Sequence, residues 1–378
     1  MVKFLPGIFT DLNNQVLKIL ETLESLDFSE ADVYSFQAKA KDQLFLLHDE
    51  IQGILGSGDL EIEELIFHNL LAYTPLFESY QSIEQFRFQP LFRYGQAEMY
   101  FNALIKRIYK EIKCSQSCPL ITTISNSDDY FWAFPHHGVI AVPLGEEKNL
   151  LNLPDLYHEI AHFIYSLYWR NFYHRFLPAL NSYFQGEIDK ANLEQTDPDN
   201  LIPFLKDVWS KWKENWVEEF TCDLIGTFLT GTAYAWTNLK LTSLSGGRNK
   251  IYEWHPTHPA DESRMRIVFM MLAYVSDTAE ITKVQKSWNE FLSSVTSPRH
   301  SYYSRAFPEN LLTELTHIVY EISTAIGLSP YSQQTGGMER PVSKILNEAW
   351  EENRSKPDGF ASWEAQTIEG LRKQLGLD

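Results

Sequence analysis

The five residues His158-Glu-Ile-Ala-His162 have the composition and spacing of a metal site on a helix. Residues four apart lie one turn apart on the same helix face, so both imidazoles can reach one ion. Glu159 lies beside them and can face the position where water would bind. Zinc lowers the pKa of that water, and the carboxylate takes its proton as the oxygen attacks a carbonyl carbon. The pattern HExxH therefore predicts a zinc-dependent hydrolase with Zn²⁺ as its cofactor.

A second acidic motif could complete this site, because a catalytic zinc takes three protein ligands and keeps one position open. Glu219 is the best candidate for the third ligand, and Asp223 follows it at the i+4 position of the same helix face. Asp223 can accept a hydrogen bond from the far nitrogen of His158, which would fix the tautomer of that ring. Glu218 competes for the ligand role, but its own i+4 neighbour is Cys222, which we expect in the core.

Both motifs also have a plainer interpretation. The two histidines could lie on a buried helix face and be satisfied by hydrogen bonds, although three buried polar groups without a metal are costly. Glu218 and Glu219 could belong to a solvated acidic helix face.

The composition argues against several other functions. The 378 residues include 32 basic and 50 acidic side chains, which gives a net charge of −18. This charge argues against binding to nucleic acid and disfavours docking on an anionic membrane. No apolar run approaches the roughly 20 residues that a membrane helix needs, and Pro6 and Gly7 interrupt any signal peptide. Because three cysteines cannot form a disulfide framework, we expect a soluble, cytoplasmic protein with reduced thiols.

The elements that must position the motifs are two long helices and a small sheet. We expect the histidine motif on a helix from about 153 to 173, and Glu219 on a second helix from about 205 to 236. Aromatic residues recur along one face of the second helix and indicate core packing: Trp209, Trp212, Trp216 and Phe220. Short runs rich in β-branched and aromatic residues predict three strands ahead of the first helix, at 119–124, 130–134 and 138–142.

The regions on either side also predict helices. Apolar residues recur every three or four positions from Leu12 to Leu26 and from Val33 to Ile51. Polar stretches at 189–200 and 243–247 predict loops.

HExxH followed by ExxxD on a later helix resembles the gluzincin metallopeptidases. The long spacer between His162 and Glu219 is more similar to the HtpX-like group than to thermolysin, where the two helices are closer in sequence. Those relatives are commonly embedded in a membrane, whereas this chain has no spanning segment. The resemblance covers roughly residues 130–270.

His258-Pro259, followed by Arg264, is similar to a His-Pro and an arginine that HtpX-like peptidases carry after the third ligand. The resemblance implies that His258 lies near the metal, as an extra ligand in a resting state or as a donor in the transition state. It implies that Arg264 is the matching arginine, with Arg266 left open. It also implies that the strand at 139–142 is the sheet edge that pairs with an extended substrate.

We therefore predict an α+β fold that is predominantly helical. Its zincin-like core, a small sheet plus two long active-site helices, spans residues 116–280. Helical regions at 1–115 and 281–378 flank this core.

The predicted function is that of a zinc metallopeptidase acting on a protein or peptide substrate. Glu159 and His258 are the catalytic candidates, Asp223 and Arg264 support the ligands, and Tyr252 could donate to the oxyanion. Three alternatives stay open: a pseudoenzyme or scaffold in which zinc only holds two helices, an interaction module built on the N-terminal helices, and a zinc hydrolase of a non-peptide amide. The sequence does not indicate the oligomeric state.

Overall fold

The computed structural model describes residues 4–62, 65–126, 130–194, 198–244, 247–334 and 339–377. Within these ranges the chain is predominantly helical and has one sheet of three strands, which confirms the predicted α+β class. None of the described helices is long and apolar enough to cross a membrane. The chain divides into two compact units, residues 1–102 with 119–144 and residues 103–118 with 145–378.

These units differ from the three regions expected from the sequence. The strands group with the N-terminal helices, and the residues after 280 group with the helices that carry the metal motifs.

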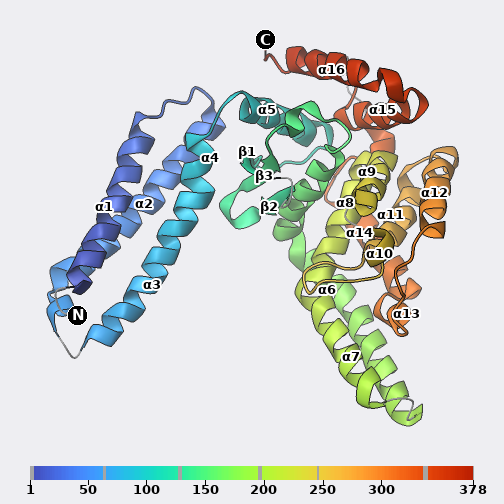
Figure 1. The fold of residues 1–378 in the computed structure, drawn as a ribbon, viewed down its shortest axis with the longest axis horizontal. Coiled ribbons are helices and arrows are strands. Elements are labelled where there is room, and N and C mark those ends of the chain that lie inside the picture. The colour runs from blue at the N-terminus through green and yellow to red at the C-terminus, as the bar shows by residue number, and fades with distance from the viewer. Residues whose placement is uncertain are drawn as a thin grey trace. The chain divides into compact units, whose positions relative to one another are not determined.

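The first unit contains long helices that lie side by side in blue in Figure 1. The apolar stripes between Leu12 and Leu23 and between Val33 and Ile51 are buried against one another, as their spacing predicts. The helices and turns of this unit are α1 (Phe4–Ser25), α2 (Ala31–Ser57), a 3₁₀ turn η1 (Asp59–Glu61), α3 (Ile66–Ile83), a π turn η3 (Glu84–Phe88), α4 (Gln89–Phe92) and α5 (Gln96–Glu111), which continues into the second unit.

The sheet of the first unit has the strand order β1-β3-β2. Strand β3 (Val139–Pro143) pairs in parallel with β1 (Leu120–Ser125) and antiparallel with β2 (Trp132–Phe134), with η4 (Pro135–His137) in the turn before it. The expectation that the strand at 139–142 forms a sheet edge is therefore wrong, because both of its sides are occupied. All five of its residues are buried, which fits the continuous apolar run of a central strand.

The second unit is built around α6 (Pro154–Glu194) and α8 (Val217–Thr230), which pack against each other. Helix α6 has 41 residues and is longer than predicted. It bends at Tyr168 and continues past Pro178, so the predicted loop from 189 is helical up to Glu194. Residues 195–197 of that loop lie outside the described residues.

The expected helix from 205 to 236 is divided into several elements. A π turn, η6 (Trp212–Trp216), separates α7 (Pro198–Lys211) from α8, and Gly231 separates α8 from α9 (Thr232–Leu244). Three of the four predicted core aromatics are fully buried, namely Trp212, Trp216 and Phe220. Helix α9 also covers the start of the loop predicted at 243–247, and residues 245–246 lie outside the described residues.

The second unit contains further helices and turns besides α6 to α9. They are η5 (Glu146–Lys148), α10 (Gly247–Lys250), α11 (Asp261–Val275), α12 (Thr278–Ser293), α13 (Tyr303–Ala306), α14 (Glu309–Ala325), η7 (Tyr331–Gln333), α15 (Val342–Ser355) and α16 (Pro357–Gln374).

Gly231 ends α8 with φ 65° and ψ −140°, a conformation that side chains rarely adopt. A Cβ atom at this position would lie 2.6 Å from the ring of Tyr331. We expect Gly231→Ala to lower the free energy of unfolding by about 1–3 kcal/mol, measured by denaturant titration.

The matched control is Gly186→Ala, at an exposed position in the interior of α6 where a Cβ atom meets nothing within 4 Å. This change should stabilise the chain by roughly 0.5–1 kcal/mol. Equal effects of the two substitutions would show that neither the backbone conformation nor the ring of Tyr331 restricts position 231.

Candidate metal centre

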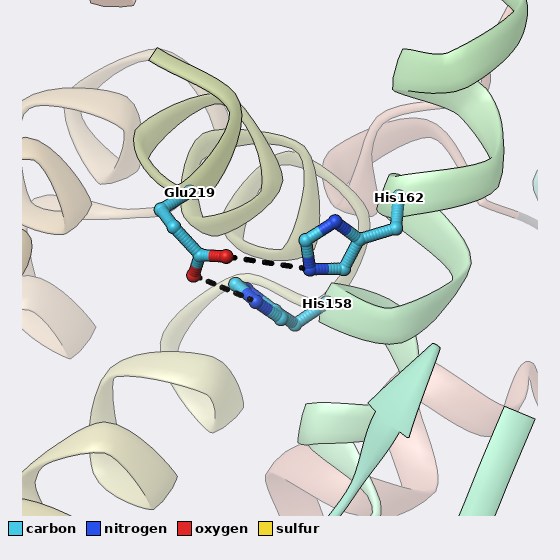
Figure 2. A group of neighbouring side chains, drawn as sticks. All are labelled: His158, His162 and Glu219. Carbon is cyan, nitrogen blue, oxygen red and sulfur yellow. Dashed lines mark ion pairs between the residues drawn. The ribbon is translucent and has the colours of Figure 1, made fainter. Parts of the chain in front are cut away.

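His158 and His162 project from α6 toward Glu219 on α8, as Figure 2 shows. The Nε2 atom of His158 lies 3.6 Å from Oε2 of Glu219, and Nε2 of His162 lies 3.8 Å from Oε1. One donor atom of each residue lies within 4.8 Å of the others. Donors bonded to zinc in a tetrahedron are about 3.4 Å apart, so small side-chain adjustments would let this set hold an ion.

The packing of α6 against α8 explains why the three side chains meet. Helix α8 is buried nearly all round, from Val217 to Thr230, as expected of a helix inside a core. On α6, Ile160 and Ala161 are completely buried between the two histidines. Apolar packing thus brings the polar positions of the two helices together.

The far nitrogen of His158 is held by buried polar groups. Its Nδ1 atom lies 3.1 Å from Oδ1 of Asp223 and 3.1 Å from the hydroxyl of Tyr234 on α9. Arg264 on α11 donates two hydrogen bonds of 2.7 Å to the two oxygens of Asp223. The contact predicted between His158 and Asp223 is present, and Arg264 supports the carboxylate.

Glu218 contacts the Nδ1 atom of His162, just as Asp223 contacts the Nδ1 atom of His158. Its Oε1 atom lies 2.8 Å from Nδ1 of His162. Consecutive residues of α8 therefore reach opposite nitrogens of the same ring, Glu218 at Nδ1 and Glu219 at Nε2. Glu218 therefore contacts a histidine and is not only part of a solvated helix face. The three donors that lie together are His158, His162 and Glu219, which we call the triad.

The charges in this cluster are strongly coupled. Burial would lower the pKa of His158, but the neighbouring carboxylates of Asp223 and Glu219 outweigh burial and raise it to about 10. Burial would raise the pKa of Glu219, but His158 and His162 lower it to about 2. Burial also opposes ionisation of Asp223, yet the adjacent Arg264 holds its pKa well below the usual range. Both carboxylates are therefore charged at neutral pH and suited to hold cations.

Glu159 lies in the same cluster with only 6% of its surface exposed. Burial raises the pKa of this carboxyl, although the nearby His158 and His162 act in the opposite direction. A carboxylate whose pKa is raised toward neutrality is a better general base than an ordinary surface glutamate.

His258 also reaches this cluster. It belongs to the His258 loop, which we define as residues 251–260, between α10 and α11. Its Nε2 atom lies 3.7 Å from Oε2 of Glu219, and 56% of its side chain is exposed. The indole of Trp216 donates to the carbonyl oxygen of His255 at 3.0 Å, so the π turn that precedes α8 anchors this loop.

Two other sequence candidates make the contacts that follow. Arg266 forms hydrogen bonds with Phe307 and Glu309, whereas Arg264 reaches Asp223. Tyr252 packs edge-on against Tyr303, with ring centroids 5.3 Å apart.

The thiols are not part of the triad. Cys222 is completely buried, as expected, and Cys114 and Cys118 are partly buried and form no disulfide in the described part of the chain.

Comparison with models of known protein families finds no match, and comparisons with curated proteins and with solved structures find none either. The resemblance to gluzincins therefore depends on the residues of the motifs alone.

Sequence reasoning missed the contact of Glu218 with His162, and it missed Tyr234 altogether. Glu218 had a signal, because each metal-binding histidine needs a partner for its second nitrogen and only Asp223 had been assigned. Tyr234 had none, because it follows a helix break whose position the sequence pattern does not reveal.

We expect the purified protein to contain about one zinc per chain, since the triad supplies three donors. His162→Ala should lose this zinc, whereas His317→Ala, which removes an imidazole that is 51% exposed on α14, should keep it. Metal content measured by atomic emission checks the prediction. A chain without zinc, or equal zinc in both variants, would contradict the site.

Proposed function

We propose that the chain is a zinc metallopeptidase whose ion is held by His158, His162 and Glu219. The observation that supports this most is the convergence of the three donors beside the buried Glu159. We also propose that α6 and α8 are the two active-site helices of a zincin-like core.

The residues present fit a catalytic zinc. Two imidazoles and one carboxylate make a common ligand set for zinc hydrolases and leave a fourth position for water or substrate. When bound, the ion would lower the pKa of a water molecule and polarise a carbonyl group.

The chain's own residues would handle the protons. Glu159 would accept a proton from the attacking water and then pass it to the leaving amine. Asp223 and Glu218 would hold the two histidines through their far nitrogens. His258 would donate to the substrate oxygen from the exposed side of the cluster.

We expect Glu159→Gln to retain zinc but to lower kcat/KM by about 10²–10⁴-fold, because an amide cannot accept the proton. Cleavage of fluorescein-labelled casein and of a mixed peptide library would be measured, with zinc content determined in parallel. Glu290→Gln, at a glutamate that is 66% exposed on α12, is the matched control. Unchanged cleavage by Glu159→Gln would exclude this mechanism.

A second function is favoured by the short distance between His258 and Glu219. If His258 is a fourth ligand, the site is closed, and the ion would only hold α6, α8 and the His258 loop together. The protein would then be a zinc-stabilised scaffold, or a peptidase in a resting state.

The substitution His258→Ala separates the two functions. In the open, catalytic site it should leave zinc affinity unchanged and lower kcat/KM by about 10²–10³-fold through loss of a donor to the oxyanion. The visible spectrum of the cobalt-substituted protein, which reports the number of ligands, should also stay the same. A changed spectrum with weaker metal binding would instead establish His258 as a fourth ligand.

A further inference from the structure

Tyr234 is a buried residue at the centre of the polar cluster, with 2% of its surface exposed. Its hydroxyl donates to Oδ1 of Asp223 at 2.6 Å and lies 3.1 Å from Nδ1 of His158. The rings of Tyr234 and His158 are nearly parallel, with an interplanar angle of 7° and centroids 6.3 Å apart. The tyrosine therefore contacts both a triad histidine and the carboxylate that supports it.

Gly226 on α8 provides the space for this tyrosine. A Cβ atom at Gly226 would lie 3.2 Å from Cε2 and 3.3 Å from Cδ2 of Tyr234, closer than ordinary packing contacts. The missing side chain lets the ring lie against the α8 backbone and reach Asp223, three residues earlier on the same helix.

The hydrogen bonds around Asp223 fix the direction of each proton. Arg264 donates to both oxygens, so the carboxylate is an acceptor only. Tyr234 has one hydroxyl proton, and the short contact assigns it to Asp223. The lone pairs of the tyrosine and of Asp223 then face Nδ1 of His158, which must carry a hydrogen. In the neutral ring, the form that a bound metal requires, the lone pair is then on Nε2, the nitrogen that faces Glu219.

We infer that Tyr234 is a positioning residue of the metal centre: it selects the tautomer and holds the ring plane of His158. The inference depends on the metal site proposed above, but not on peptide hydrolysis. Tyr234 acts on the metal through the histidine and does not itself act as a ligand.

The first test is Tyr234→Phe, which keeps the ring and removes the hydroxyl. Zinc affinity, measured by competition with a chromophoric chelator, should fall by about 10–100-fold. The control is Tyr109→Phe, which removes another buried hydroxyl, one with no hydrogen-bond partner in the described part of the chain. It should leave zinc affinity unchanged. Thermal unfolding of both variants shows whether they are folded.

A spectroscopic measurement separates positioning from general stability. In the zinc form labelled with ¹⁵N-histidine, the Nδ1 proton of His158 should exchange slowly with water in the unaltered chain. In Tyr234→Phe it should exchange faster, because one of its two acceptors is gone. Unchanged exchange together with unchanged affinity would overturn the inference.

Gly226→Ala tests the same contact from the other side. The new methyl group should displace the tyrosine ring and weaken zinc binding less than Tyr234→Phe does. In a Tyr234→Phe background the same change should have little further effect on zinc affinity, because both act through the lost hydroxyl contact. Fully additive effects would mean that Gly226 and Tyr234 act independently, and would overturn this account.

The outcomes separate the two proposals. If the unaltered chain binds no zinc, the metal centre is wrong and the role of Tyr234 with it. If the unaltered chain and Tyr234→Phe bind zinc equally, only the role of Tyr234 is wrong.

Discussion

The ion pair between Asp223 and Arg264 is the interaction on which the candidate site depends. The carboxylate is completely buried, and removing such a charge from water costs several kcal/mol unless it is paired and hydrogen-bonded. Two hydrogen bonds from Arg264 and one from Tyr234 provide this compensation. Because the participating residues come from α8, α9 and α11, and because His158 on α6 joins them, one buried carboxylate connects four helices. The geometry of the triad therefore depends on groups that would never touch a metal.

The two histidines are supported in different ways. His158 contacts a buried carboxylate and a tyrosine, whereas His162 contacts Glu218, whose side chain is 38% exposed. The inner histidine is thus held by a network whose members cannot move separately. The Nδ1 atom of the outer one contacts the partly exposed Glu218 instead, so fewer buried groups hold it. Such an arrangement would allow the outer ligand to adjust when an ion or a substrate arrives, while the inner ligand keeps its orientation.

The sequence predicts the parts of this site that follow from helical periodicity. His158 with His162, and Glu219 with Asp223, are i and i+4 pairs, so their common faces can be read without a structure. The strands were also located, because β-branched runs are local signals. What could not be predicted depends on contacts between distant segments: the central place of β3, the end of α8 at Gly231 and the approach of Tyr234. Gly231 is a single glycine whose missing side chain leaves room for the ring of Tyr331, a hundred residues later in the chain.

The π turn at Trp212–Trp216 has a consequence for how the chain can vary. A π turn contains more residues than an α turn. It therefore changes the direction in which the side chains of the following helix, α8, point. Each residue of an α-helix advances the side chains by about 100°, so deleting one residue here would turn the carboxylates of α8 away from the histidines while leaving the composition almost unchanged. Besides its buried Trp212 and Trp216, this segment must therefore preserve its length. A chain shortened by one residue here would keep every residue of the candidate site and still lose its geometry.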